Sequence, residues 1–341
     1  MNKPGKQIIV SLLIGCTLIA GAVRANTTAP ARVIFDTDMS GDCDDCGALA
    51  LLNKLSDMGE ARILACVANS RERQNAVAAS ISAINTYYGR PDIPIGTYHG
   101  SDGALIGSAY AAELRDKFPH HALPDDQEPA ALDVYRTALA AAPDRSVTVV
   151  SVGFFCNLRD LLRSKPDALS PLSGPELIRA KVKQLVVMGG RFPASDPDHG
   201  EYNFSASIPL DTKFVVSHWP TPILFSGFEI GISIITGKSL ASTPATNPVR
   251  RAYELAYGNC VRNGRPSWDL TAALAAVRDP RTYWNLSPAG TCDVSNIGTN
   301  TWNPQPDTGR TYLIRKLPPT EIARILDNLI TSLPARENRS K

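Results

Sequence analysis

The sequence predicts a single α/β domain with an open, mostly parallel sheet and helices on both faces. Nearly continuous apolar, β-branched runs alternate with helical patterns along the chain, and most of the runs end in residues able to do chemistry. Strands of this composition are typical of parallel sheets, which helices cover on both sides. The length allows two domains. Because no Gly/Ser linker or internal repeat interrupts the chain, one domain is favoured.

Six short apolar runs are predicted strands, at 32–36, 63–68, 93–98, 147–152, 184–188 and 222–226. Helices are predicted where longer segments carry apolar residues at helical spacing, at 45–56, 73–88, 130–142, 157–164, 249–257, 268–277 and 319–332. In an open α/β sheet, ligands bind outside the carboxyl ends of the strands. A composite site is therefore expected along that edge.

The most informative segment is an acidic loop directly after the apolar run Val33-Ile34-Phe35. Ten residues contain five aspartates, namely Asp36, Asp38, Asp42, Asp44 and Asp45. So much negative charge is costly in a folded chain unless a cation neutralises it. Carboxylate oxygens are hard ligands that suit calcium or magnesium. The loop therefore predicts a divalent-metal site in an active centre.

Two alternatives, an ordinary helix start and an EF-hand calcium loop, explain fewer of the five aspartates than a divalent-metal site in an active centre does. Aspartate favours the first turn of a helix, which explains two or three of the five. A calcium loop of the EF-hand type would place Asp36, Asp38, Ser40 and Gly41 at loop positions 1, 3, 5 and 6. Its twelfth position would then be Gly47 in place of glutamate, and the preceding segment is strand-like.

The N-terminus has the pattern of a secretory signal peptide. Lys3 and Lys6 precede an uncharged stretch at 8–23, and Val23-Arg24-Ala25 offers a small-residue cleavage site. We expect residues 1–25 to be removed and 26–341 to form an exported domain, periplasmic or secreted. The alternative is a lipid anchor at Cys16, but the apolar stretch continues beyond it. No later segment is long and apolar enough to span a membrane.

Charge points to a small-molecule partner. Removing Lys3, Lys6 and Arg24 leaves 32 of the 35 basic residues against 33 acidic ones, a net charge of −1. No Lys/Arg-rich run indicates nucleic acid or an acidic membrane. The sequence leaves open whether the chain forms a homo-oligomer.

Six cysteines follow the cleavage site: Cys43, Cys46, Cys66, Cys156, Cys260 and Cys292. Export permits disulfides, although connectivity does not follow from sequence. Cys43 and Cys46 have the spacing of a redox or zinc pair, but no second such pair completes a four-cysteine zinc site. A bridge between Cys260 and Cys292 is expected, because both lie in Gly/Pro/Asn-rich chain.

The acidic loop resembles the longer-loop form of the N-terminal signature of the inosine–uridine-preferring nucleoside hydrolases. The resemblance runs from about Val33 to Val277, and further segments agree in order: Asn69, Gly153-Phe154-Phe155-Cys156-Asn157-Leu158, Met188-Gly189-Gly190, Glu201-Tyr202-Asn203-Phe204 and Trp268-Asp269. It implies a nucleoside hydrolase-like fold and hydrolysis of the N-glycosidic bond of ribonucleosides to base and ribose.

The resemblance also implies a role for individual residues. One calcium ion would be bound by Asp38, Asp45, Asp269 and the backbone carbonyl of Cys156, with Asp38 as the general base that takes a proton from water. Ribose hydroxyls would be bound by Asp44, Glu201 and Asn203, with Asn69 close to the sugar. Such a polar site rejects analogues that lack a hydroxyl.

Departures from the family pattern bear on the substrate. Many members have a histidine, the general acid for the leaving base, where this chain has Trp268. A tryptophan there resembles the purine-specific branch, in which the base is held by stacking. A family asparagine before Glu201 has no clear counterpart, and Ile208-Pro209-Leu210 replaces the usual Asp-Pro-Glu. His99 follows a predicted strand and lies on the edge where a base would bind.

Two further functions compete with that of a nucleoside hydrolase. A haloacid-dehalogenase-like phosphatase would use the pair Asp36 and Asp38, with magnesium as its ion. It expects Thr or Val where Ser40 stands, and it has no role for Asp44 and Asp45. The second alternative is a non-catalytic nucleoside- or sugar-binding protein, which the missing histidine favours and the retained aspartates oppose.

Overall fold

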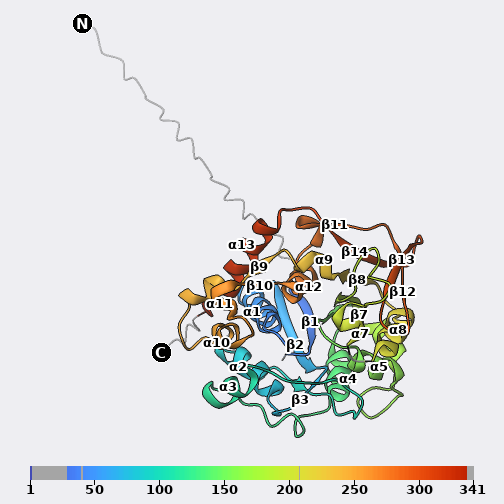
Figure 1. Cartoon of the computed structure of the whole chain (residues 1–341), viewed down its shortest axis with the longest axis horizontal. Coiled ribbons are helices and arrows are strands. Elements are labelled where there is room, and N and C mark those ends of the chain that lie inside the picture. The colour runs from blue at the N-terminus through green and yellow to red at the C-terminus, as the bar shows by residue number, and fades with distance from the viewer. Residues whose placement is uncertain (2–28, 40, 207, 336–341) are drawn as a thin grey trace.

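The centre of the fold is an eight-stranded sheet with the strand order β11-β14-β8-β7-β6-β1-β2-β4 (Figure 1). The computed structural model describes Met1 and residues 29–39, 41–206 and 208–335. The strands are β1 (Ala31–Thr37), β2 (Ala61–Ala68), β4 (Ile95–Gly96), β6 (Val147–Ser151), β7 (Val182–Met188), β8 (Ile223–Ser226), β11 (Trp284–Leu286) and β14 (Arg310–Arg315). Neighbouring strands run parallel except for the edge pair β11–β14. The predicted fold class is confirmed.

Alternate residues of β1 point to two separate hydrophobic cores. Val33 and Phe35 pack into the core on one face, and Ile34 packs into the core on the other. The first face is covered by α1 (Asp44–Asp57), α2 (Val77–Tyr87), α10 (Pro248–Leu255), α12 (Trp268–Val277) and α13 (Pro319–Ile330). The second is covered by α4 (Ala131–Ala141), α5 (Cys156–Arg163), α6 (Gly174–Lys181) and α8 (Pro209–His218). Such two-sided burial explains the continuous apolar strands.

All six predicted strands and all seven predicted helices are present, with shifted ends. The run at 93–98 forms only Ile95–Gly96, and α2 begins at Val77 because Arg71–Glu72 (β3) pairs with Leu105–Ile106 (β5). Helices α6 and α8 and strands β11 and β14 were not predicted. Neither were the smaller elements, which are α3 (Ala111–Lys117), α7 (Tyr202–Ser205), α9 (Phe228–Gly231), α11 (Cys260–Asn263), the 3-10 turns η1 (Lys238–Ser242) and η2 (Pro280–Thr282), and the ribbons β9 (Ile235–Thr236) with β10 (Arg265–Pro266) and β12 (Gly290–Val294) with β13 (Asn300–Pro304).

The expected bridge between Cys260 and Cys292 is wrong. The six cysteines from Cys43 onward are all free thiols. Cys260 packs in the core beside α1, whereas Cys292 packs in the core on the opposite face of the sheet. Flexible-looking sequence around both residues gave no information on which face each would occupy.

The N-terminal predictions fall largely outside the structure. The expected signal peptide and the alternative anchor at Cys16 belong to residues 2–28, which are not described. Within the described part of the chain, no helix is long and apolar enough to cross a membrane.

Candidate active site

The carboxyl edge of the sheet opens into a cavity of about 450 Å3. Residues just beyond β1, β6, β7 and β8 line it, including Asp38, Val152, Met188 and Phe228. Its other walls come from the first turns of α1 and α12 and from the segment between α10 and β10. The composite site expected at this edge is therefore present.

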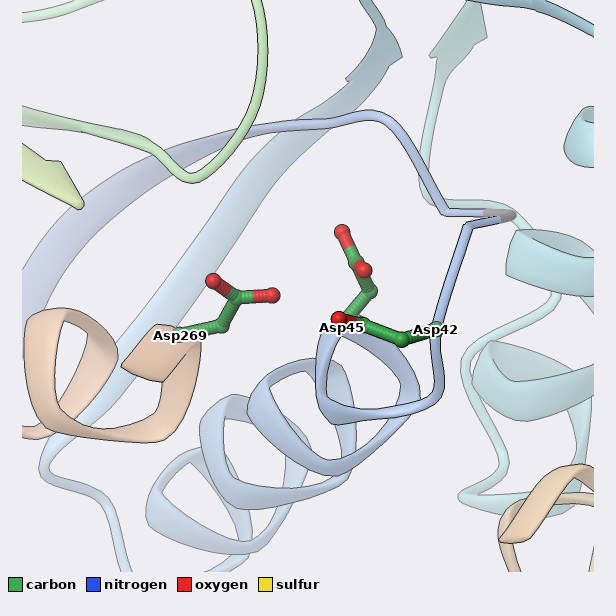
Figure 2. Close-up of side chains that lie close together, drawn as sticks. All are labelled: Asp42, Asp45 and Asp269. Carbon is green, nitrogen blue, oxygen red and sulfur yellow. The ribbon is translucent and has the colours of Figure 1, made fainter. Parts of the chain in front are cut away.

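Three carboxylates gather on one side of the cavity (Figure 2). Asp42 precedes α1, Asp45 lies in the first turn of α1, and Asp269 lies in the first turn of α12. One ligand oxygen from each lies within 4.8 Å of the others, a grouping able to hold a metal ion. The amino ends of two helices favour negative charge here, because the helix dipole is positive at that end.

Asp38 joins this group from the end of β1. Its carboxyl group is hydrogen-bonded to Asp45, and burial, followed by the charges of Asp45 and Asp42, raises its pKa well above the ordinary value. Burial also raises the pKa of Asp45 to about 6 and that of Asp269 well above its ordinary value. Burial and neighbouring negative charges disfavour the ionised form of these carboxyls, and a nearby cation would offset that cost. The group therefore fits a hard divalent ion.

Of the three aspartates expected to bind the metal, the grouping contains Asp45 and Asp269, and its third member is Asp42 in place of Asp38. The side chain of Asp45 is fixed by the hydroxyl of Thr37 and by the backbone amide of Met39, 3.1 Å away. Asp42 forms an ion pair with Arg265. Nε of the same arginine lies 3.8 Å from Oδ1 of Asp44, and nothing in the sequence marked Arg265 as part of the site.

Asp44 faces the same cavity but has a second task. Its Oδ2 accepts hydrogen bonds from the backbone amides of Trp268 (2.9 Å) and Asp269 (3.2 Å), so it ties the start of α12 to α1. Its Oδ1 is buried, has no hydrogen-bond partner and lies 3.8 Å from Nε of Arg265. A free acceptor remains for a ligand hydroxyl.

Glu201 and Asn203, expected to bind ribose, both line the same cavity as the aspartates. Glu201 accepts hydrogen bonds from the backbone amides of Gly190 (3.0 Å), Asn203 (3.1 Å) and Phe204 (3.3 Å), and burial raises its pKa to about 7. The side-chain nitrogen of Asn203 donates to the carbonyl of Met188 at 3.1 Å. The side-chain oxygen of Asn203 is not used in this hydrogen bond and can accept from another group.

Asn69 and Cys156 lie behind the cavity wall in the described structure, since neither lines the cavity. Asn69 donates to the fully buried Asp36 at 2.7 Å and accepts from the backbone amide of Phe154 at 2.9 Å. Cys156 starts α5, and its thiol contacts the carbonyl of Asn69 at 3.0 Å. Asp36 also accepts from Tyr135 at 2.6 Å, so it organises the loops beneath the site.

An aromatic wall stands beside the carboxylates. Trp268 stacks on Phe228 with ring centroids 5.4 Å apart, and its indole nitrogen donates to the carbonyl of Phe228 at 3.0 Å. Each ring also has an arginine close by, since Arg191 lies over the ring of Phe228 at 4.4 Å and Arg265 over that of Trp268 at 5.1 Å. Of these four, sequence patterns had identified only Trp268. The Ser226-Gly227 ending of a strand was the one signal for Phe228.

None of the five histidines lines this cavity, and all five belong to the described residues. His99 lines a separate hollow near Arg71 and contacts Thr97 at 3.0 Å. The cavity therefore offers no imidazole to protonate a leaving group.

The fold and the site define an α/β enzyme whose sheet edge holds a carboxylate cluster able to bind a metal ion. The model of the inosine-uridine preferring nucleoside hydrolases matches residues 33–311, and the chain belongs to that family. It is a hydrolase of the N-glycosidase class, which cleaves the N-glycosidic bond of nucleosides. This replaces the phosphatase alternative.

Solved structures agree with the fold. A plant nucleoside hydrolase is 20% identical, with a TM-score of 0.64 over 89% of this chain and 99% of that one. A purine-preferring ribonucleoside hydrolase from Gardnerella vaginalis is 15% identical, with a TM-score of 0.65 over 88% of this chain and 97% of the other. An inosine-guanosine nucleoside hydrolase is 17% identical, with a TM-score of 0.64 over 89% and 100%. No curated protein matches the sequence.

Proposed function

We propose that this chain is a calcium-dependent hydrolase that prefers purine ribonucleosides and acts after export. The observation that carries the proposal is the content of one cavity, which has the carboxylates Asp45 and Asp269 on one side and the stacked rings of Trp268 and Phe228 beside them. A nucleoside needs both features, because its sugar is polar and its base is flat and aromatic.

Calcium suits the donor set, which consists of carboxylate oxygens. Asp38, Asp45 and Asp269 are the proposed side-chain ligands, and Asp42 adds a fourth carboxylate. The family resemblance adds the backbone carbonyl of Cys156, a residue that does not itself line the cavity. When bound, the ion would lower the pKa of a ligated water and offset the charge of the carboxylates. Burial raises the pKa of Asp38, and a neighbouring cation would favour its charged form, which can act as a general base.

Ribose recognition is proposed for Asp44, Glu201 and Asn203. The unpartnered Oδ1 of Asp44 can accept a hydrogen bond from a sugar hydroxyl, and Asn203 can supply its side-chain oxygen. A substrate without that hydroxyl would leave the buried Oδ1 unpaired, which costs about 1–3 kcal/mol. We therefore propose that 2′-deoxynucleosides are poor substrates. Asn69 is proposed to support the site from behind through Asp36 and Phe154.

A purine is the proposed base. Its two fused rings offer a larger face to Trp268 than a pyrimidine does, and it can take a proton on its ring from solvent. None of the described histidines lines the cavity, which supports this assignment because uridine cleavage benefits more from a side-chain acid. One of the structural neighbours is itself a purine-preferring ribonucleoside hydrolase.

The test is a panel of inosine, guanosine, adenosine, uridine and 2′-deoxyinosine, each incubated with and without a calcium chelator. Released base is measured by chromatography and free sugar by its reducing end. We expect base and ribose in equal amounts, faster turnover of purine ribonucleosides, and loss of turnover in chelator that added calcium restores. Unchanged activity after exhaustive chelation would refute calcium dependence, and binding without turnover would favour a non-catalytic nucleoside-binding protein.

A further inference from the structure

One arginine at the wall of the active-site cavity keeps its charged group free. Of the described residues that line the cavity, Arg191 and Arg265 are the only cations. Arg265 pairs with Asp42 and lies 3.8 Å from Asp44. The guanidinium of Arg191 lies over the ring of Phe228 at 4.4 Å and forms no hydrogen bond or ion pair within the described part of the chain. Contact with a ring face leaves the five N–H donors of this guanidinium available.

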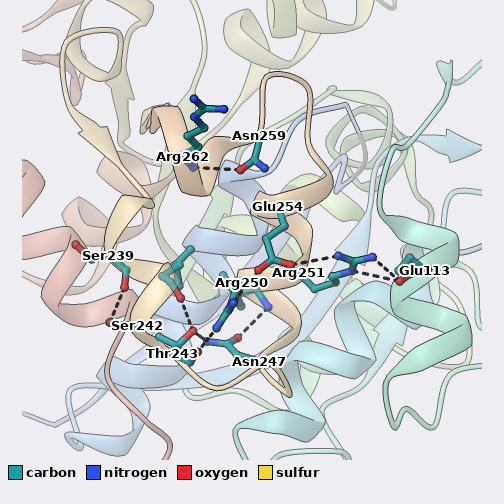
Figure 3. A network of polar contacts seen from close by, with 12 residues as sticks. Glu113, Ser239, Ser242, Thr243, Asn247, Arg250, Arg251, Glu254, Asn259 and Arg262 are labelled. Carbon is teal, nitrogen blue, oxygen red and sulfur yellow. Dashed lines mark hydrogen bonds and ion pairs between the residues drawn. The ribbon is translucent and has the colours of Figure 1, made fainter.

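Helix α10 illustrates what an arginine with a structural role looks like in this chain. Figure 3 shows Arg251 between Glu254 of the same helix, at 3.2 Å, and Glu113 of α3, at 2.8 Å. Both acids use that guanidinium to hold α10 in place. The charge of Arg191 does reach Glu229, where it partly opposes the rise in pKa that burial causes, but the two side chains form no ion pair. The guanidinium of Arg191 is therefore available to a ligand.

The backbone at Arg191 is fixed, so the place of its side chain is built into the site. Its amide donates to Oδ1 of the buried Asn300 at 3.0 Å, and its carbonyl accepts from Nδ2 of the same side chain at 2.8 Å. The preceding residue, Gly190, donates to Glu201 at 3.0 Å and accepts from the amide of Phe228 at 2.8 Å. Arg191 therefore follows directly on a link between a residue proposed to bind ribose and the wall proposed to hold the base.

The charge of the cavity bears on the kind of group that Arg191 can bind. Beside the two arginines, the cavity is lined by the carboxyl groups of Asp38, Asp42, Asp44, Asp45, Glu201 and Asp269. This excess of acids would repel a strongly anionic group such as a phosphate. A neutral group that presents two acceptors side by side is favoured instead, because a guanidinium donates through a planar fork.

We propose that Arg191 is a specificity-determining residue that donates to O6 and N7 of a 6-oxopurine base, such as hypoxanthine or guanine. The inference rests on the purine nucleoside hydrolase function proposed above and names the class of base. In guanine both atoms are acceptors, which arginine binds through two N–H groups, whereas adenine presents an amino donor at position 6. A guanidinium has donors only, so it favours the oxo base and leaves the amino group of adenine without an acceptor.

The same contact would help the base to leave. When the bond between C1′ and N9 breaks, its electron pair passes to the purine, and the negative charge spreads onto O6 and N7. Water supplies a hydroxyl to C1′, and its other proton passes through Asp38 to solvent, from which the purine takes up one proton. Arg191 keeps its own protons, because a guanidinium is not deprotonated in proteins. A fixed cation that faces atoms gaining negative charge in the transition state lowers the barrier.

The experiment compares kcat/KM for inosine, guanosine and adenosine in the wild type and in Arg191→Met, which removes the donors but keeps a long side chain against Phe228. We expect the wild type to favour inosine and guanosine over adenosine by about tenfold or more, the usual effect of a bidentate contact. Arg191→Met should lower kcat/KM for inosine by about tenfold and that for adenosine much less.

Arg163→Met is the matched control. Arg163 also lies over a phenylalanine ring, that of Phe214 at 4.7 Å, but it belongs to α5 and does not line the cavity. All three nucleosides should keep their wild-type kcat/KM in this variant. 7-Deazainosine, in which a carbon replaces N7, tests the contact at one atom. Because one acceptor is absent, Arg191→Met should cost less on this substrate than on inosine, whereas loss of a residue that only packs against Phe228 would cost the same on both.

Equal cleavage of inosine and adenosine by the wild type would overturn the role of Arg191 and leave the nucleoside hydrolase function standing, as would an equal loss on all three nucleosides in Arg191→Met. Faster cleavage of inosine 5′-monophosphate than of inosine, lost in the variant, would replace the proposal by phosphate recognition. No turnover of any nucleoside would overturn both proposals. If circular dichroism shows that Arg191→Met is misfolded, Arg191→Lys takes its place, because it keeps the charge without the planar fork and should lose the preference for inosine.

Discussion

Oδ2 of Asp44 accepts a hydrogen bond of 2.9 Å from the backbone amide of Trp268, which lies 224 residues later in the chain. The same oxygen accepts the amide of Asp269 at 3.2 Å. One carboxylate thus sets the positions of Trp268 and of Asp269, a member of the carboxylate cluster, at once. The residues proposed to bind sugar, base and metal therefore meet at one joint between α1 and α12.

Replacement of Asp44 should therefore cost stability as well as activity. Asp44→Ala removes the acceptor for two helix-end amides and is expected to lower the free energy of unfolding by about 1–2 kcal/mol, the usual effect of losing a helix cap. Asp44→Asn retains one side-chain oxygen and should lose less. Urea unfolding curves measure both variants. Equal stability of wild type and Asp44→Ala would show that the joint does not depend on this carboxylate.

Asp45→Asn is expected to weaken calcium binding and turnover together. Asp45 is a member of the carboxylate cluster, and its side chain is also hydrogen-bonded to Asp38. Ligand at about 100 times its Kd stabilises a protein by about 2.7 kcal/mol, so calcium should raise the melting temperature of the wild type and not of the variant. Turnover should fall by about a hundredfold or more, because the proposed general base Asp38 loses the cation that would keep it charged, and general-base effects are worth at least about 10². Asp116→Asn, a surface change, is the matched control.

The metal-free protein should lose stability as pH rises from about 4 to about 7. Burial raises the pKa of Asp36 to about 7 and that of Glu201 to about 7. Such carboxyls ionise near about pH 4 in the unfolded chain, so within this window the unfolded state binds fewer protons than the folded state. The free energy of unfolding must then decrease with rising pH and level off above the folded pKa values.

Urea midpoints measured in chelator at about pH 5 and about pH 7.5, either side of the folded pKa of Glu201, provide the check. Glu201→Gln cannot ionise and should show a shallower fall with pH than the wild type, even though it is less stable throughout. A midpoint that increases between the two pH values would contradict the buried, proton-holding state of these carboxyls.

Local sequence patterns predicted the central sheet well for a physical reason. Strands β1, β2, β6, β7 and β8 are buried on both faces, so their apolar composition is required by the fold. The last two strands on one side of the sheet, β11 at the edge and β14 next to it, carry weaker signals. Trp284–Leu286 lies among loop residues, and its place beside Arg310–Arg315 depends on pairing between segments that local composition does not encode.

As with the sheet, some residues of the site could be predicted from local sequence and others could not. The aspartate-rich loop drew attention to Asp38 and Asp45 because five carboxylates in ten residues are conspicuous, and the resemblance to the family added Asp269; all three line the cavity. Arg265 and Phe228 were missed, since their importance comes from contacts with Asp42 and Trp268 that only the folded chain creates. The error over the bridge from Cys260 has the same origin, because local flexibility does not show which side of the sheet a cysteine occupies.

Trp268 provides the test of base recognition. Trp268→Ala should reduce kcat/KM for inosine by about tenfold, because an aromatic pair contributes about 0.5–1.5 kcal/mol beyond the buried area, which is lost as well. Trp268→Phe keeps a ring to stack on Phe228 and should lose less, although it lacks the indole donor to the Phe228 carbonyl. A uniform loss on inosine and uridine would indicate a packing role rather than base recognition.

Histidine at the same position tests how the leaving base is activated. If Trp268 holds the base by stacking, as proposed, the wild type should cleave inosine faster than uridine, whose smaller ring gains less contact and takes up a proton less readily. Trp268→His removes the indole and supplies an acid, an effect worth about 10²–10⁴-fold when the group is well placed. We therefore expect this variant to lose inosine turnover and gain uridine turnover, measured as kcat/KM for each nucleoside. A wild type that prefers uridine would contradict the role given to Trp268, because a stacking wall without an acid gives a pyrimidine no advantage.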